Sequence, residues 1–165
     1  MNIRDASTAD APAIVAIYNH YILTTTISFE EDSVDAGTMA GRIADIQQGG
    51  YPFLVLTDGE RIAGYAYATK WRVRHAYRFA VESSVYLSPG DGGKGHGAAL
   101  YAALLARLAD SGFHTVIGGI AQPNPASEAL HEKFGFRKVA HFSEVGFKFG
   151  RWIDVAYWEL KLKGA

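Results

Sequence analysis

The sequence predicts a single α/β domain, residues 1–165, in which helices flank a central mixed sheet. The first observation is the order of segments between 79 and 109. A run rich in β-branched and aromatic residues leads into a glycine-rich loop and then into an alanine- and leucine-rich helix. The second is a pair of strand-like segments on each side of this unit. The third is size, since 165 residues with 48% hydrophobic content supply one core and leave no room for a second domain.

Residues 2–6 form a short predicted strand, and the first predicted helix follows. Ser7 or Thr8 can cap this helix with a side-chain oxygen. Five apolar residues then recur on one face at helical spacing, which indicates core packing: Ile14, Ile17, Tyr18, Tyr21 and Ile22. The polar and β-branched stretch 24–30 interrupts this period, so we expect an irregular loop there.

A second helix is predicted to begin after Asp35, which can cap it, and to end at the glycine pair 49–50. Two strands, 53–57 and 62–69, lie on either side of an Asp-Gly turn signal. They are expected to pair antiparallel.

The central unit begins with a strand at 79–87, which stops at a Ser-Pro pair. Five glycines follow within 90–97, and a helix with an apolar leucine stripe covers 98–109. Amides at the first turn of a helix point outward at the positive end of its dipole, and glycines let a pyrophosphate approach the main chain. Lys94 adds a positive charge. The first hypothesis is a ligand that carries phosphate.

Two nucleotide-binding alternatives fit this loop less well. A triphosphate loop needs Ser or Thr after its Gly-Lys pair, and this chain has no such pair at the required spacing. Gly90, Gly92 and Gly95 do spell the dinucleotide pattern Gly-x-Gly-x-x-Gly. That fold also wants an acidic residue at the end of the next strand, where this chain has Ala121 and Gln122. A dinucleotide oxidoreductase therefore stays a weaker alternative.

The last third of the chain is predicted to alternate strand and helix before closing with a strand pair. Strand 115–121 contains the pair Gly118-Gly119, which suggests a bulge or a close backbone approach. A helix begins after Asn124. Strands 140–149 and 152–162 then pair around a turn.

Composition narrows the classes of partner. A formal net charge of −1 gives no field that would recruit a polyanion, so we expect no nucleic-acid partner. The chain has no cysteine, which excludes disulfides and thiolate metal sites, and its six histidines show no metal-binding spacing. No apolar run has the length of a membrane span and the amino terminus lacks the apolar core of a signal peptide, so we expect no membrane association and a cytoplasmic location.

A basic cluster leads directly into the central strand. Guanidinium groups here can hold a carboxylate bidentately, although charged runs are often only solvated surface. The cluster lies within nine residues and comprises Lys70, Arg72, Arg74, His75 and Arg78.

Several motifs in the second half of the chain resemble one family in its own order. Gly-Gly-Lys-Gly-His-Gly-Ala at 92–98 is similar to the acyl-coenzyme A loop of the GNAT family of N-acetyltransferases, except that Gly92 stands where the family has Gln or Arg. The segments 82–86, 123–127, 130–136 and 146–154 resemble the branch that acetylates phosphinothricin and methionine sulfoximine. This resemblance implies a mostly antiparallel GNAT-like sheet, acetyl-CoA as the acetyl donor and a homodimer.

The resemblance also implies site residues. The strand amides at 85–87 would face the thioester oxygen if the strands splay there, and the loop and the following helix would hold the cofactor. The expected acetyl-CoA contacts are Val85, Tyr86, Leu87, Gly93, Lys94, Gly95, His96, Gly97, Ala98, Asn124 and Ser127. The expected contacts to the amino-acid substrate are Arg72, Arg74, Tyr77 and Phe29. Trp152 and Asp154 match the branch without a role that follows from the sequence.

Acetyl transfer to an amine needs a base and a proton for the leaving thiolate. Glu82 is the only acid in the apolar strand 79–87, where partial burial would raise its pKa toward that of a working base. It can instead pair with Arg72 or Arg74. His131 stands where the wider family has a Tyr acid, although a lone histidine on a helix is often structural. The sequence thus predicts an N-acetyltransferase acting on a small amino-acid-like acceptor, with a non-catalytic acyl-CoA-binding module as the alternative.

Overall fold

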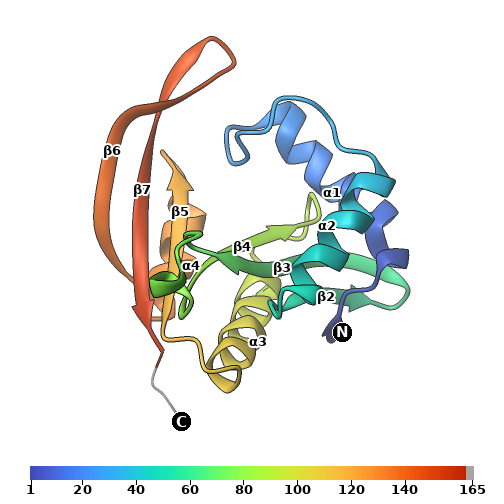
Figure 1. Cartoon of the computed structure of the whole chain (residues 1–165). Coiled ribbons are helices and arrows are strands. Elements are labelled where there is room, and N and C mark those ends of the chain that lie inside the picture. The colour runs from blue at the N-terminus through green and yellow to red at the C-terminus, as the bar shows by residue number, and fades with distance from the viewer. Residues whose placement is uncertain (163–165) are drawn as a thin grey trace.

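The computed structural model describes residues 1–162, and these form one seven-stranded sheet in the order β1-β2-β3-β4-β5-β7-β6. The strands are β1 (Asn2–Asp5), β2 (Phe53–Asp58), β3 (Arg61–Lys70), β4 (Ala80–Leu87), β5 (Thr115–Ala121), β6 (Arg137–Lys148) and β7 (Arg151–Lys161). The pair β4·β5 is parallel and the other neighbours are antiparallel. The predicted mixed, mostly antiparallel sheet is confirmed (Figure 1).

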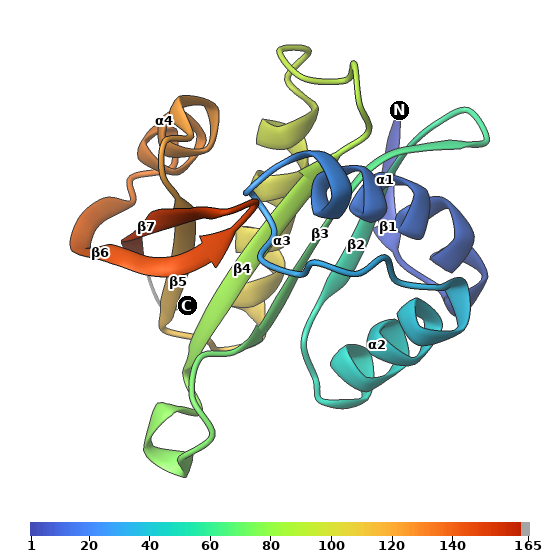
Figure 2. The same ribbon diagram turned by 90° about the horizontal axis from the view of Figure 1, so that it is seen from above.

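Helices cover both faces of this sheet. They are α1 (Ala11–Thr24), α2 (Ala36–Gln48), α3 (His96–Asp110) and α4 (Pro125–Lys133), with short 3-10 turns at η1 (Thr8–Asp10) and η2 (His75–Tyr77). Apolar side chains of α1 and α2 share one buried cluster with β2 and β3, and those of α3 and α4 pack in a second cluster on the opposite face. Figure 2 shows α1 and α2 on one side of the strands β2–β4 and α3 on the other.

Local capping explains where the helices begin. Asp35 accepts a hydrogen bond from the Thr38 amide at 2.6 Å, as predicted. Ser7 forms a capping box with Asp10, but it starts the 3-10 turn η1 rather than α1. Helix α3 begins at His96, two residues before the predicted start, because Gly95 takes a left-handed backbone with φ of +83° and caps it.

The strand boundaries are also close to those predicted. In the β2·β3 hairpin Asp58 pairs with Arg61, so a two-residue loop joins the strands. The predicted turn at 150–151 lies one residue earlier, at Phe149 and Gly150, and Arg151 already belongs to β7. Strand β6 starts at Arg137, three residues before the prediction.

Strands β4 and β5 separate soon after they meet. They pair at three positions, ending with Glu82 opposite Ile117, although β4 continues to Leu87 and β5 to Ala121. The sheet therefore has two arms, β1–β4 and β5–β7, which open like a V in Figure 1. Of the two predicted alternatives for Gly118-Gly119, a bulge or a close approach, the bulge is wrong, since β5 pairs with β7 in unbroken register.

Candidate active site at the splay of the sheet

The splay leaves two peptide groups of β4 without a strand partner on the β5 side. Trp71 N donates to Ala80 O at 3.2 Å and Ser88 N donates to Ala63 O at 2.9 Å, at the two ends of the β3·β4 ladder. Hydrogen-bonded residues alternate in an antiparallel ladder, so the even-numbered residues of β4 bond to β3. The odd-numbered amides of Val85 and Leu87 consequently face the splay.

Of the three amides at 85–87 that were predicted to face the thioester oxygen, this geometry allows only two to do so. The amides of Val85 and Leu87 can serve as donors to a developing negative oxygen. The amide of Tyr86 cannot do so, because it belongs to the β3 ladder, and its ring instead lines a cavity on the other face of β4. Tyr21 on α1 donates its hydroxyl to Leu87 O at 2.8 Å, so the carbonyl of this peptide unit has a partner from outside the sheet.

A cavity of about 360 Å³ lies on the side of the glycine loop. It is open to solvent and mostly apolar, and its rim contains the start of α3. Its lining comprises Tyr21, Ile27, Val85, Leu87, Ser88, Pro89, Gly90, Gly92, Gly97, Asn124, Ala126, Ser127 and Leu130. Five of the expected acetyl-CoA contacts are therefore among the lining residues: Val85, Leu87, Gly97, Asn124 and Ser127. We call this space the donor cavity.

The first turn of α3 supplies the anion site of this cavity. The first intrahelical bond runs from Ala99 N to Gly95 O, so the amides of His96, Gly97 and Ala98 have no partner within the helix. Gly93 and Gly95 both have positive φ, which glycine adopts without strain. An array of outward amides beside a glycine loop fits a pyrophosphate. Asn124 caps α4 by accepting from Ser127 N at 3.2 Å, which leaves the NH₂ of its side chain as a donor at the cavity wall.

Two of the expected acetyl-CoA contacts, Lys94 and His96, have their side chains near Asp91. The ammonium of Lys94 lies 3.0 Å from Asp91, which also binds Arg61 at 2.5 Å. These two cations hold the pKa of Asp91 below its usual range. His96 is buried and lies near the same carboxylate, at 3.9 Å. Lys94 thus fastens the loop through Asp91, whereas His96 Nδ1 has no hydrogen-bond partner within residues 1–162. Neither side chain is among the residues that line the donor cavity.

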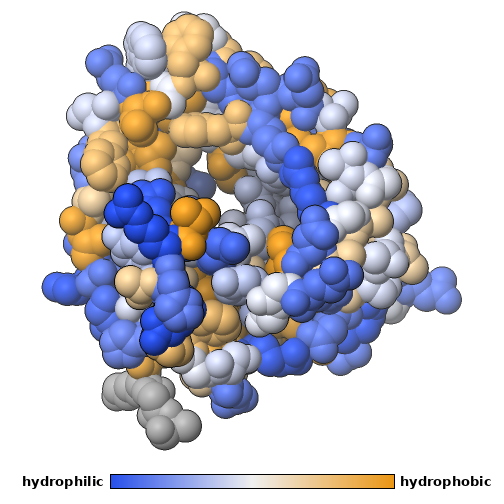
Figure 3. Space-filling view, viewed as in Figure 1, coloured by the Kyte–Doolittle hydropathy of each residue, from blue (hydrophilic) through white to orange (hydrophobic). Residues whose placement is uncertain are grey.

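A second cavity, of about 650 Å³, lies on the other face of the splay. We call it the acceptor cavity, and Figure 3 shows this face hollowed between the two arms. Its lining comprises Tyr18, Ile27, Ser28, Phe29, Glu30, Glu82, Ser84, Tyr86, Gly119, Ala121, Val145, Val155 and Tyr157. Phe29 is the one expected substrate contact among these residues.

Glu82 lies at the last paired position of β4 and points into the acceptor cavity. Burial raises the pKa of Glu82, and the nearby Arg72 guanidinium partly opposes this rise. The predicted elevated pKa is therefore confirmed in direction. Gly119 makes room for this carboxylate, since a Cβ there would lie 3.3 Å from Glu82 Oε1 and 2.9 Å from the Tyr157 ring. The glycine pair is thus a site of close approach by side chains.

The basic cluster approaches the cavity through Arg72 only. The Arg72 guanidinium stacks 4.4 Å from the centre of the Trp71 ring, and Trp71 packs edge-on against Tyr157 of the cavity wall. Arg74 and Tyr77 belong to the exposed turn η2 and its cap, and they are not among the lining residues. Their contact with substrate stays a prediction.

His131 is buried in a chain of hydrogen bonds between α4 and α3. Its Nδ1 lies 2.7 Å from Ser127 O and its Nε2 lies 2.9 Å from the Tyr101 hydroxyl, which in turn lies 2.6 Å from Ser83 Oγ. A carbonyl can only accept, so Nδ1 carries the proton and Nε2 accepts from Tyr101. Burial lowers the pKa of His131. The lowered pKa favours the neutral imidazole. The role of His131 as an acid stays a prediction, and His131 is among the residues that line the narrow space between β4 and β5.

A narrow space of about 60 Å³ joins the two cavities between β4 and β5. It shares Val85, Asn124 and Ser127 with the donor cavity, and Ser84 and Gly119 with the acceptor cavity. Ile27 lines all three spaces. A donor on one face and an acceptor on the other can therefore meet beside Glu82 and the free amides.

Comparison with known proteins decides what this arrangement is. Residues 3–157 match the model of the acetyltransferase (GNAT) domain. The chain belongs to the GNAT acetyltransferase family. A phosphinothricin N-acetyltransferase of Streptomyces coelicolor is 41% identical over 98% of this chain and 96% of its own. An L-methionine sulfoximine/L-methionine sulfone acetyltransferase of Salmonella typhimurium is 38% identical, covering 98% and 95%.

A solved structure agrees with the fold and with the donor. The phosphinothricin acetyltransferase of Sinorhizobium meliloti, solved with acetyl-CoA, superposes with a TM-score of 0.95 at 40% identity, covering 99% of this chain and 90% of its own. The GNAT protein described here is thus an acetyl-CoA-dependent N-acetyltransferase, as the sequence predicted. Membership of this family disfavours both alternatives, the non-catalytic module and the dinucleotide oxidoreductase.

Sequence reasoning missed several residues of this GNAT site. Tyr157 and Val145 come from the closing strand pair, which carried no chemical signal in the sequence, and Tyr21 and Ile27 come from the first helix and its loop. Within residues 1–162, no helix is long and apolar enough to cross a membrane, and no cluster of three His, Asp or Glu side chains could hold a metal ion.

Proposed function

We propose that this GNAT enzyme transfers the acetyl group of acetyl-CoA to the amine of a small amino-acid-like acceptor, such as phosphinothricin, methionine sulfoximine or methionine sulfone. The observation that carries the proposal is the meeting of two cavities at the splay, with Glu82 in one and the Val85 and Leu87 amides beside the other. Named relatives that act on these acceptors support the choice of substrate class.

Each chemical demand has a residue in this scheme. Acetyl-CoA supplies an activated acetyl group. Glu82 takes a proton from the acceptor ammonium, directly or through a water, because its raised pKa brings it nearer to neutral pH. The Val85 and Leu87 amides stabilise the negative charge that develops on the acetyl oxygen. Arg72 at the cavity mouth holds the acceptor carboxylate, with Arg74 and Tyr77 as further predicted contacts.

The apolar residues of the acceptor cavity suit the rest of such a substrate. Phe29, Val145 and Val155 form a wall that would contact an aliphatic side chain. The proton for the leaving thiolate is assigned to His131 as a prediction, with the difficulty that this residue must first gain a proton.

A homodimer in the cytoplasm is part of the proposal. The β6–β7 hairpin exposes a group of large apolar side chains, which supports an interface with a second copy. These are Val139, Phe142, Val145, Phe147, Phe149 and Trp152, each between 47% and 63% exposed. Apolar residues gather over this hairpin in Figure 3. Light scattering of the purified protein tests the assembly, and a monomer at all concentrations would refute it.

A thiol-release assay tests the reaction. The purified enzyme is mixed with acetyl-CoA and a panel of amino acids with their phosphinic, sulfone and sulfoximine analogues, and free thiol is followed. We expect release with the analogues and none with their N-acetylated forms. Acetyl-CoA binding without release for every acceptor would refute the proposed function.

A further inference from the structure

Residues 25–30, which we call the strap, lie between α1 and α2 at the mouth of the site and contact both arms of the sheet. The strap leaves the end of α1 and contributes to each of the three spaces. Ile27 lines all of them, while Ser28, Phe29 and Glu30 line the acceptor cavity. The strap has no strand or helix structure of its own. Its position therefore depends on how its ends and its centre are held.

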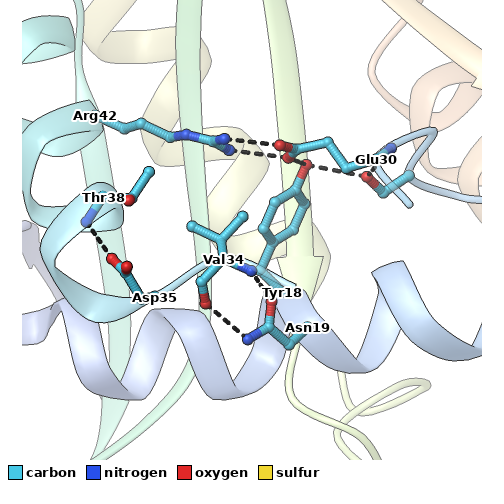
Figure 4. Close-up of polar contacts among 8 residues, drawn as sticks. Tyr18, Asn19, Glu30, Val34, Asp35, Thr38 and Arg42 are labelled. Atoms are coloured by element: carbon cyan, nitrogen blue, oxygen red, sulfur yellow. Dashed lines mark hydrogen bonds and ion pairs between the residues drawn. The ribbon is translucent and has the colours of Figure 1, made fainter. Parts of the chain in front are cut away.

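On one side the strap is held by α1 and α2. The Tyr18 hydroxyl bonds to Ser28 Oγ at 3.0 Å and also donates to the Glu30 carboxylate. The Arg42 guanidinium on α2 donates two hydrogen bonds to the Glu30 carboxylate, at 2.7 and 2.9 Å. Figure 4 shows this network, with Asn19 and Val34 holding the chain that follows the strap. All of these anchors lie on the β1–β4 arm.

On the other side the strap is held by Lys148, the last residue of β6. Its side chain is only 1% exposed, and its Nζ donates to Ser28 O at 2.6 Å and to Ile22 O at 2.7 Å. Ile22 lies in the last turn of α1, where carbonyl groups lack helical partners and the helix dipole is negative. One ammonium from the β5–β7 arm thus ties both the end of α1 and the centre of the strap.

A second contact from the same face of β6 supports this fastening. Gly146 and Lys148 are two residues apart, so they face the same side of the strand. The Phe29 ring lies directly against Gly146, in the space that a side chain there would occupy. Strand β6 therefore holds the strap at two points. The Lys148 ammonium binds Ser28 O, and Gly146, which has no side chain, leaves room for the Phe29 ring.

Burying an ammonium costs free energy unless its donors find acceptors. An apolar residue at position 148 would fill the space of the lysine side chain without the cost of burying a charge. It would, however, leave the carbonyls of Ser28 and Ile22 without this hydrogen-bond donor. The bonds that offset the cost at Lys148 all go to the strap and to the helix end from which it leaves. What this charge accomplishes is therefore the placement of the strap.

We propose that Lys148 is a positioning residue that holds Ile27 and Phe29 in place as the wall of the acceptor cavity. This inference rests on the proposed function, because the consequence concerns acceptor binding. A loosened strap should weaken acceptor binding more than acetyl-CoA binding, since three of its residues line only the acceptor cavity.

The test is Lys148→Met, which keeps a long apolar stem and removes the charge. We expect KM for methionine sulfoximine to rise by about tenfold to a hundredfold, the scale of small misplacements in a site, while KM for acetyl-CoA changes far less. In the wild-type protein the amides of Ile27 and Glu30 donate to Thr25 Oγ1 and Ser28 Oγ, respectively. Hydrogen exchange at these two amides should be faster in the variant. Lys138→Met, at an exposed lysine of the same strand, is the matched control and should change neither measurement.

Gly146→Ala keeps the proposal testable if Lys148→Met fails to fold. It retains the ammonium and displaces only the Phe29 ring, so it should also raise the acceptor KM selectively. A folded Lys148→Met protein with the wild-type acceptor KM and wild-type exchange at 25–30 would overturn the proposal. If the wild-type enzyme acetylates no acceptor, the proposed function fails by itself, while the exchange measurement still decides whether Lys148 holds the strap.

Discussion

The imidazole of His131 fills the space that a side chain on Gly118 would need. An alanine at position 118 must therefore push His131 away from Tyr101. We expect Gly118→Ala to lower the free energy of unfolding by about 1–3 kcal/mol, as overpacking of a core does. Urea denaturation measures this change. The control is Gly41→Ala, whose Cβ meets nothing within 4 Å in the middle of α2 and should raise stability by about 0.5–1 kcal/mol.

Glu82→Gln should keep the shape of the acceptor cavity but remove the proton acceptor. We expect kcat to fall by about 10²–10⁴, the range for the loss of general acid–base help. The wild-type rate should rise with pH through the pKa of Glu82, which burial places above 4.5. The variant should lack this acidic limb. A variant with the wild-type rate and the same limb would show that Glu82 is structural.

Arg72 and Arg74 should affect that acidic limb differently. Arg72 lowers the pKa of Glu82, so Arg72→Gln should move the limb to higher pH. Arg74→Gln should leave its position unchanged, because Arg74 lies on the exposed turn at η2. Both variants should raise the acceptor KM if both guanidinium groups hold the carboxylate. Comparing the pH profiles of kcat/KM separates the two roles, and a shift of equal size in both variants would contradict this assignment.

The sequence predicted most of the fold because its local signals agreed with the tertiary structure. Asp35 capped α2, and the segment 115–121 formed β5 with the predicted ends. The same agreement placed Glu82 in the site, since an acid in an apolar strand is unusual. The motifs of the GNAT family singled out further residues, including Asn124 and Gly97, which line the donor cavity.

Other features depended on contacts that no local pattern encodes. The Gly118-Gly119 pair marked a close approach, but only the structure shows that His131, Tyr157 and Glu82 are what approach. Lys148 lies in the segment 146–154 that resembles the branch, but no local pattern predicts its contacts, because its acceptors lie 120 and 126 residues away in the chain. The finding that the Tyr86 amide cannot face the thioester oxygen depends on which residues of β4 form hydrogen bonds to β3. The hydropathy of the sequence does not show which residues these are.

Gly92 occupies the position where the family has Gln or Arg, and the structure leaves room for either. A Cβ on Gly92 would meet nothing within 4 Å, and its φ is not in the left-handed region. Gly92 also lines the donor cavity. We therefore expect Gly92→Arg to fold normally and to tighten acetyl-CoA binding, by a gain on the order of 1 kcal/mol from one charge-assisted contact. Calorimetric titration measures it, and unchanged affinity would place this position away from the pyrophosphate.

His131 should leave separate traces in stability and in catalysis. Because burial lowers its folded pKa below 6.5, the unfolded chain binds a proton at a pH where folded His131 does not. The contribution of His131 to stability is therefore full above about pH 6.5 and declines as the pH falls toward its lower folded pKa. His131→Asn should lack this part of the pH dependence, which urea denaturation at several pH values measures. If His131 also protonates the leaving thiolate, the variant should slow turnover with acetyl-CoA more than with a thioester whose thiolate leaves unprotonated. Equal slowing with both donors, together with the altered stability profile, would make His131 a structural residue and leave the acid to be found elsewhere.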